Sequence, residues 1–145
     1  MRQGRPALRL EVPSETGFLG LVREVTRKMA EVAGFEDQTA DQVALAVDEA
    51  ATNVLEHAYR GAPDRVVRFD MDDHGDSFCV DVVDDGESFD PASRPALDLR
   101  SLERNRRTGG LGVHLMERIM DSVTFERSAR ENVCCLVKRK RPRSA

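Results

Sequence analysis

The first half of the chain has two stretches in which apolar side chains recur every three or four residues, the spacing of an amphipathic helix. The first stretch starts near Ser14, a possible N-cap, and ends near Gly34. The second starts at a capping-box pattern, Thr39 with Gln42, and ends at Gly61. The apolar positions of the two expected helices are Phe18, Leu21, Val22, Val25, Met29 and Val32, then Val43, Val47, Ala50, Ala51, Val54, Leu55 and Ala58.

Short runs rich in β-branched and aromatic residues predict strands before the first helix and through the second half of the chain. The expected strands are residues 7–12, 66–71, 78–83, 123–127 and 133–139. Turns around Gly75 and residues 129–132 join four of these strands as two hairpins, and a helix over about 111–120 precedes the second hairpin. Residues 84–108 show no period and are too long for a routine connection, so we expect a functional loop or lid there.

The order of these elements, β-α-α-β-β-loop-α-β-β, predicts an α+β fold, because it gives runs of strands with helices between them. We expect a two-layer α/β sandwich in which helices cover one face of a mixed, mostly antiparallel sheet. A chain of 145 residues is long enough for one hydrophobic core. We therefore expect residues 1–145 to form one domain, with a basic tail at about 138–145.

Composition narrows the class of protein further. With 40% hydrophobic residues, 33% charged residues and a formal net charge of −4, the chain is typical of a soluble globular protein and not of a basic nucleic-acid binder. The run KRKRPR at 138–143 is strongly basic, and we favour a solvated charge cluster there over direct nucleic-acid binding. No apolar run approaches the roughly 18 residues that cross a bilayer, and no signal peptide is apparent, so we expect a cytoplasmic protein without membrane contact. The three cysteines form no CxxC pattern and are expected to be buried thiols.

The segment AVDEAATNVLEHAY, residues 46–59, aligns several polar groups along the second helix. Residues three or four apart are helical neighbours, so these groups share one side. They are Glu49, Asn53, Glu56 and His57. A solvated polar face is the ordinary explanation, and the alternative is that Glu49 and Asn53 line a cleft.

Two motifs that contain glycine follow. In VVDDGESFDP, residues 82–91, Asp84 ends an apolar strand and can accept a hydrogen bond from an exocyclic amine, while Gly86 permits close approach of a ligand. Asp-Gly is also ordinary turn chemistry. In TGGLG, residues 108–112, glycines open directly onto a helix, whose N–H groups and dipole favour a phosphate. A flexible hinge is the alternative, and neither a P-loop nor a Rossmann pattern fits.

Taken in this order, the three motifs resemble the N, G1 and G2 boxes of the GHKL ATPase and kinase superfamily. The segments EAATNVLEHAY, DDGESFDP and GGLGVHLMERIMDSVTFE carry the resemblance, which spans about residues 8–138. The chain is most similar to the anti-sigma factor serine kinases of the RsbW and SpoIIAB type, of which FDP and MDSVTFER are especially typical. Histidine kinases, gyrase and Hsp90 share the fold but carry further domains.

The resemblance implies a site for ATP and Mg²⁺. Asn53 matches the asparagine that holds Mg²⁺ on the ATP phosphates, and Glu49 matches the glutamate proposed as the general base for the attacking hydroxyl. Asp84 matches the aspartate that reads the adenine amino group, with Gly86 packed beside the base. His57 aligns with a histidine often found in this branch, for which we expect a packing or hydrogen-bonding role.

The resemblance also implies a lid over the nucleotide at about residues 88–109. Gly110 and Gly112 match the glycines that hinge the lid and let backbone amides reach phosphate, and Gly109 and Leu111 belong to the same binding segment. One lid arginine is expected to reach the γ-phosphate, and the candidates are Arg104, Arg106 and Arg107, with the last two favoured.

The chain departs from the family pattern at two places. Ser88 replaces the second glycine of G1, which affects the geometry of the lid. Val133 and Cys134 stand where relatives often have threonine near the adenine, which affects nucleotide affinity. Neither departure removes an essential group.

The function implied is that of a protein serine/threonine kinase that is also a binding module. Such a protein sequesters a sigma factor when loaded with ATP, and phosphorylates a STAS-domain anti-anti-sigma factor, which is partner switching. Relatives are commonly homodimers, so a homodimer is expected. One alternative is a nucleotide-gated binding protein without significant kinase activity, against which the retention of Glu49 and Asn53 argues. Another is a detached ATPase subunit of a histidine-kinase-like system, which we disfavour because no phosphoacceptor histidine motif is visible.

Overall fold

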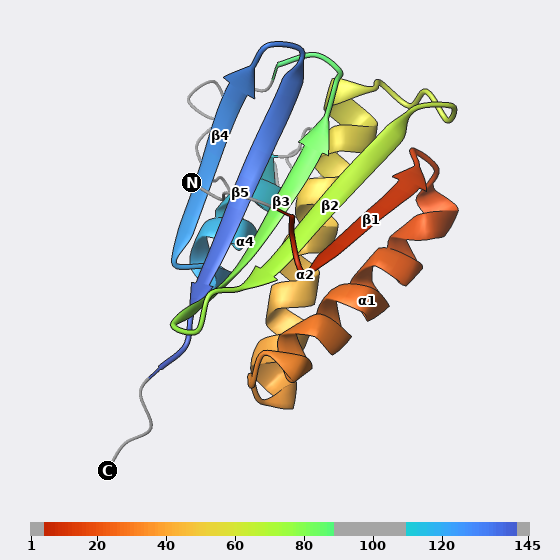
Figure 1. Cartoon of the computed structure of the whole chain (residues 1–145). Helices are drawn as coiled ribbons and strands as arrows, with labels where there is room; N and C mark the ends of the chain where they lie inside the picture. Colours follow the sequence, from red (N-terminus) through yellow and green to blue (C-terminus); the bar gives the residue numbers. More distant parts are fainter. Residues whose placement is uncertain (1–4, 89–109, 142–145) are drawn as a thin grey trace.

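The structure, a computed structural model, describes residues 5–88 and 110–141. Its centre is a five-stranded sheet with the order β1-β2-β3-β5-β4 (Figure 1). Every neighbouring pair among the described strands is antiparallel, so the sheet is not mixed in this part of the chain. The strands are β1 (Leu8–Pro13), β2 (Val66–Asp73), β3 (Ser77–Asp84), β4 (Ser122–Ser128) and β5 (Glu131–Arg139).

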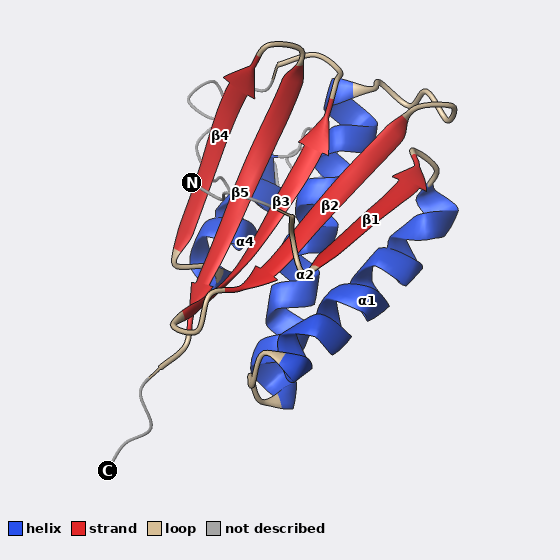
Figure 2. Ribbon diagram, viewed as in Figure 1, coloured by secondary structure: helices blue, strands red, loops and turns tan. Residues whose placement is uncertain are grey.

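The described α-helices lie together on one face of the sheet (Figure 2). They are α1 (Leu19–Val32), α2 (Asp37–Asn53) and α4 (Gly110–Ile119). A short 3-10 turn, η1 (Thr16–Phe18), precedes α1, and a π-helical turn, η2 (Val54–Ala58), continues α2. The predicted α+β sandwich with helices on one face is therefore confirmed.

The core lies between the helix layer and the sheet, because alternate strand residues point toward the helices. In β3, Phe78, Val80 and Val82 are fully buried, and they alternate with residues on the other face. Phe78 also meets Phe35 edge-on, with 6.2 Å between the ring centroids. Burying a side chain of this size contributes about 1.5–3 kcal/mol. This core fixes the register of the strands, and the register places the polar groups at their ends.

The two predicted helix caps are not formed. The hydroxyl of Ser14 donates to the carbonyl of Ala62 and accepts from the amide of Arg65 at 3.1 Å, so it fastens the end of β1 to the loop before β2. Helix α2 begins two residues before Thr39, and its N-cap residue makes no side-chain cap bond. A buried hydroxyl needs partners, and the backbone that faces Ser14 supplies them in place of a local cap.

The end of α2 also differs from the prediction of one regular helix that continues to Gly61. The amide of Tyr59 donates to the carbonyl of Val54 at 2.9 Å, a bond that spans five residues instead of four. Gly61 then closes the turn with a positive φ of 82°. The wider turn changes the direction of the side chains that follow Asn53.

The structure also bears on the cysteines and the basic tail. The three thiols are free, with Cys134 buried and Cys79 and Cys135 half-buried. Lys138 belongs to β5, not to a tail, and its Nζ donates to the carbonyl of Ile119 at 2.7 Å. Within residues 5–88 and 110–141, no helix combines the length and apolar character needed to cross a membrane.

Candidate functional site

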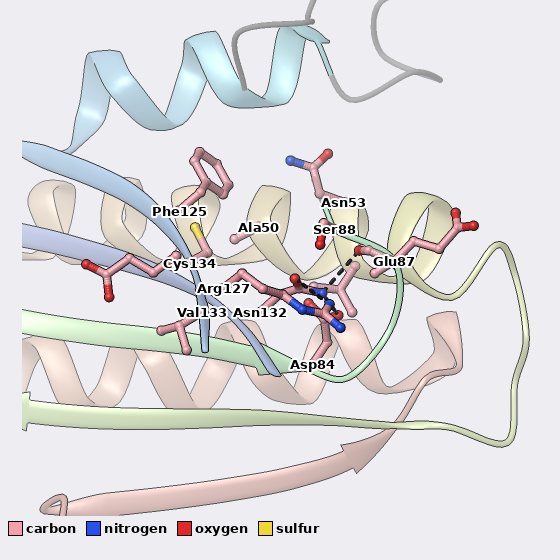
Figure 3. A pocket seen from close by; sticks show the side chains of 13 residues that line it. Ala50, Asn53, Asp84, Glu87, Ser88, Phe125, Arg127, Asn132, Val133 and Cys134 are labelled. Carbon is pink, nitrogen blue, oxygen red and sulfur yellow. Dashed lines mark hydrogen bonds between the residues drawn. The ribbon is translucent and has the colours of Figure 1, made fainter. Parts of the chain in front are cut away.

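A cavity of about 300 Å³ lies between the end of α2, the end of β3 and the β4–β5 hairpin (Figure 3). Its apolar lining consists of Ala50, Val54, Ala58, Phe125, Val133 and Cys134. Its polar lining includes Asn53, Asp84, Glu87, Ser88, Arg127 and Asn132. A mostly apolar cavity with a few convergent polar groups is the usual form of a small-molecule site.

Asp84 is the most buried carboxylate of this lining, with 7% of its surface exposed. Its Oδ1 accepts from the amide of Gly86 at 2.9 Å and from Nδ2 of Asn132 at 2.8 Å. Its Oδ2 has no hydrogen-bond partner among the described residues. Burial raises the pKa of Asp84, and the two hydrogen bonds oppose that increase. The carboxylate therefore offers an acceptor oxygen to a ligand that carries a donor.

Asn132 and Arg127 were not predicted as site residues, although they hold the Asp84 loop. Nη1 of Arg127 donates to the carbonyl of Gly86 and to Oδ1 of Asn132, both at 2.9 Å. The sequence pattern placed Asn132 in a turn, where asparagine is common. The strand register contained the missing signal: pairing Val82 with Cys134 also pairs Asp84 with Asn132.

Gly86 lies against the chain's own backbone. A Cβ at this position would stand 2.3 Å from the carbonyl oxygen of Ala58, and the next amide, of Glu87, donates to that oxygen at 3.0 Å. Gly86 is not among the residues that line the cavity. Gly86 was expected to let a ligand come close, but its close contact in the structure is with η2. This contact holds residues 85–88, here called the G1 loop, against the π-helical turn.

Tyr59 connects η2 to both adjacent strands. Its hydroxyl donates to the carbonyl of Val66 at the start of β2 and accepts from the amide of Asp85 at 3.1 Å. The guanidinium of Arg65 lies 4.6 Å from the centre of the tyrosine ring and binds Oδ1 of Asp85 at 2.7 Å. This network fixes the end of β3, and therefore Asp84, relative to α2.

A titration of Tyr59 tests whether this network exists in solution. Burial raises the pKa of Tyr59 to about 12, whereas an unfolded tyrosine titrates near ~10. The chain contains one tyrosine, so the ultraviolet absorbance of tyrosinate reports on Tyr59 alone. We expect a midpoint near 12 in the folded protein and a lower one in denaturant.

The same shift predicts how stability depends on pH. The stabilisation from protonated Tyr59 is complete below about pH 10, the unfolded pKa, and is lost as the pH rises toward 12. In the Tyr59→Phe variant this loss should be absent, so the difference in unfolding free energy between the two proteins should shrink over that range. A midpoint near 10 in the folded protein would contradict the buried network.

Asn53 and Asp84 lie on opposite sides of the group of labelled side chains in Figure 3. Asn53 is 8% exposed, and its Nδ2 is buried without a hydrogen-bond partner among the residues that the structure describes. An unpaired buried amide costs about 1–3 kcal/mol. Such a cost is usually retained only where a ligand or a solvent molecule satisfies the group.

Glu49 lies one helical turn before Asn53 and is half-buried. It faces the start of α4, because a Cβ on Gly112 would stand 2.8 Å from Oε2 of Glu49. The structure therefore brings the predicted glutamate and one predicted glycine together. Glu56 instead is exposed, and His57 is half-buried on η2; neither lines the cavity.

The first turn of α4 contains Gly110, Leu111 and Gly112, and the closeness of Gly112 to Glu49 places this end of the helix beside α2. The predicted residues Arg106, Arg107 and Gly109 lie outside the described part of the chain, as does most of the expected lid.

The residues present fit a nucleotide with a divalent cation. The unpaired Nδ2 donor of Asn53 suits a phosphate oxygen, and the oxygen of the same amide suits Mg²⁺, which prefers oxygen ligands. No cluster of three or more acidic, histidine or cysteine ligands occurs among the described residues. Mg²⁺ is commonly held by one or two protein groups together with substrate phosphates and waters.

The fold and this cavity define the class of protein. The family model described as the histidine kinase-like ATPase domain matches residues 12–138, so the chain belongs to that family. Within it, the chain is similar to the RsbW serine-protein kinases. It is 32% identical over 118 residues to serine-protein kinase RsbW of Listeria monocytogenes, which covers 79% of this chain and 75% of that protein. With RsbW of Bacillus subtilis it shares 28% identity over 131 residues, or 87% and 81% of the two chains.

A solved structure supports the fold. The crystal structure of the RsbU and RsbW domains of a Mycobacterium tuberculosis protein matches with a TM-score of 0.59 and 18% identity. The match covers 92% of this chain and 33% of that one. The family model and the RsbW relatives confirm the predicted family and, through the names of those relatives, the predicted class of enzyme, a serine-protein kinase.

Proposed function

We propose that the chain binds ATP with Mg²⁺ in the cavity between α2 and the β4–β5 hairpin and transfers the γ-phosphate to a serine or threonine of a protein partner. The observation that carries this proposal is the joint placement of Asp84 and Asn53 in one apolar cavity. One end offers a buried carboxylate oxygen, which suits an amine of adenine. The other end offers an unpaired buried amide, which suits the metal and phosphates.

Each residue has a distinct role in this proposal. Asp84 accepts from the exocyclic amine of adenine, and Asn53 holds Mg²⁺ at the phosphates. Glu49 accepts the proton of the attacking hydroxyl, and the first turn of α4 directs backbone N–H groups at phosphate. Bound Mg²⁺ supplies neutralisation of the charge that develops on the phosphoryl oxygens. The protein therefore acts mainly by positioning, by charge and by taking one proton.

The partners follow from the family and remain part of the proposal. RsbW relatives are named as serine-protein kinases. We infer that this chain sequesters a sigma factor when it carries ATP, phosphorylates a STAS-domain anti-anti-sigma factor, and works in the cytoplasm as a homodimer. The phosphorylated partner then leaves, which is the partner switch.

A first test is the Asp84→Asn variant, measured by calorimetric titration with ADP and Mg²⁺. The substitution keeps the size of the side chain but makes it partly a donor, which then opposes the amine of the base. We expect the dissociation constant to rise by roughly 10²-fold, since a polar site discriminates strongly against a mismatched partner. Asp76→Asn, which makes the same change on an exposed carboxylate just before the other end of β3, should have a much smaller effect. Equal affinity of Asp84→Asn and the unaltered protein would exclude this carboxylate as the adenine contact.

A further inference from the structure

The side chain of Asn132 connects three parts of the cavity wall. Its Nδ2 donates to Oδ1 of Asp84 at 2.8 Å and lies 3.1 Å from the carbonyl oxygens of Gly86 and Glu87. Its Oδ1 accepts from Arg127 on β4 at 2.9 Å. A primary amide has two N–H donors, so one serves Asp84 and the other serves the loop carbonyls. Asn132 therefore links β5 to the end of β3, to the G1 loop and to β4.

This link determines which oxygen of Asp84 a ligand meets. Oδ1 receives two donors, the side chain of Asn132 and the amide of Gly86 at 2.9 Å. Rotation of the carboxylate would break both bonds, and hydrogen bonds to an ionised group are among the stronger ones. Oδ2 is consequently left as the acceptor at a fixed place in the cavity wall.

We propose that Asn132 is a positioning residue that sets the nucleobase selectivity of the cavity by holding Asp84 with one acceptor oxygen toward the base. The inference rests on the proposed function and concerns the residue that enforces the choice of adenine, not the one that contacts it. Adenine presents an amine donor to this oxygen. Hypoxanthine and guanine present a carbonyl at the same place, whose lone pairs oppose a carboxylate.

The choice of base also requires Asp84 to stay ionised, because a protonated carboxyl would present a donor. Burial raises the pKa of Asp84, and the hydrogen bond from Asn132 is the largest influence that lowers it. The other charged groups of the cavity wall and its edge are Asp85, Glu87, Glu126 and Arg127, of which Asp85 raises the pKa and Arg127 lowers it. The α2–η2 wall contributes no charged side chain to the described lining. Nucleotide affinity should fall at acid pH as Asp84 takes up a proton, and this decrease is here called the acid limb. Removing Asn132 should move the acid limb to higher pH.

The test measures the dissociation constants of ADP and of inosine diphosphate, each with Mg²⁺, by calorimetry over a range of pH. The unaltered protein should prefer ADP by about 10²-fold or more. In Asn132→Ala this preference should fall about tenfold or more, and the acid limb of ADP binding should shift upward by about half a pH unit or more. The ratio of the two constants is independent of the phosphates, which both ligands share.

Three further variants separate positioning from folding. Asn132→Asp keeps the shape of the side chain but removes the Nδ2 donor, so it should lose the preference for ADP as Asn132→Ala does. It replaces the alanine variant in the test if that variant does not fold. Arg127→Ala removes a second support of the same loop but leaves the bond between Asn132 and Asp84 in place, so it should keep more of the preference than either Asn132 variant. Glu131→Ala alters the neighbouring residue, which pairs with Arg68, and controls for damage to the hairpin.

Two different results would overturn the inference. If both Asn132 variants weaken ADP and inosine diphosphate by equal factors and leave the acid limb in place, Asn132 only supports the fold and the inference fails alone. If the unaltered protein binds neither nucleotide, the proposed function fails and this inference fails with it.

Discussion

Replacing Glu49 by glutamine is expected to slow phosphate transfer to the protein partner by roughly 10²-fold or more, the usual scale for a general base. Glutamine keeps the length and hydrogen bonding of the side chain but does not take a proton at neutral pH. Glu49 lies against Gly112 at the start of α4, one turn from Asn53, where a transferred phosphoryl group is expected. ATP binding should therefore survive the change, and the loss should fall on the transfer step, measured in single-turnover experiments.

Two other variants should be measured beside Glu49→Gln, one as a control and one as a contrast. Glu56→Gln makes the same chemical change on an exposed residue of η2, and should leave transfer unaltered. Asn53→Ala removes the proposed metal ligand, and should weaken Mg-ATP binding and transfer together. A Glu49→Gln protein that phosphorylates its partner at the unaltered rate would show that Glu49 is not the base and that this part of α2 only forms a wall of the site.

Replacing Gly86 by alanine is expected to disrupt the site even though the glycine does not line the cavity. The added Cβ would stand 2.3 Å from the carbonyl oxygen of Ala58 and 2.9 Å from the ring of Tyr59. Because the nearest atoms are backbone, the G1 loop must move away from η2. We expect a loss of about 1–3 kcal/mol of unfolding free energy, as for other overpacked sites, together with a loss of nucleotide affinity by about tenfold or more as Asp84 is displaced.

Gly20→Ala is the matched control for this change. Apart from the backbone of its own helix turn and its chain neighbours, no described residue has an atom within 4 Å of a Cβ at Gly20, which is in α1. Alanine is the better helix former, so this variant should be neutral or more stable. Thermal unfolding and ADP titration of both variants measure the contrast. Equal stability and equal affinity of Gly86→Ala and the unaltered protein would show that the loop does not depend on its contact with η2.

Much of the fold could be predicted because it depends on periodicity. The three-to-four spacing correctly predicts a helix over Leu19–Val32, but two of its expected core residues, Leu21 and Val32, are exposed. The alternation of Phe78, Val80 and Val82 correctly predicts the buried face of β3. The caps were predicted less well. Ser14 is a good capping residue locally, yet its hydroxyl is bound by Ala62 and Arg65, which are distant in sequence.

The site residues that belong to sequence motifs could be predicted. The residues that join the site only through tertiary contacts could not. Asp84 and Asn53 belong to motifs, and both line the cavity. Asn132 carries no local signal, since its importance comes from the pairing of β3 with β5. The π turn after Asn53 is equally hidden, because an alanine-rich sequence predicts a regular helix. In the structure the carbonyl of Ala58 at the end of this turn instead accepts from the amide of Glu87, which is distant in sequence.

The most direct measurement of the central claim is phosphate transfer by the unaltered protein. The protein is incubated with Mg²⁺, ATP labelled at the γ-phosphate, and each STAS-domain protein encoded in the same genome. We expect one of these proteins to gain label on a serine or threonine, and no label to appear when the ATP carries its label at the α-phosphate instead. Binding of ATP without transfer to any STAS-domain protein would contradict it.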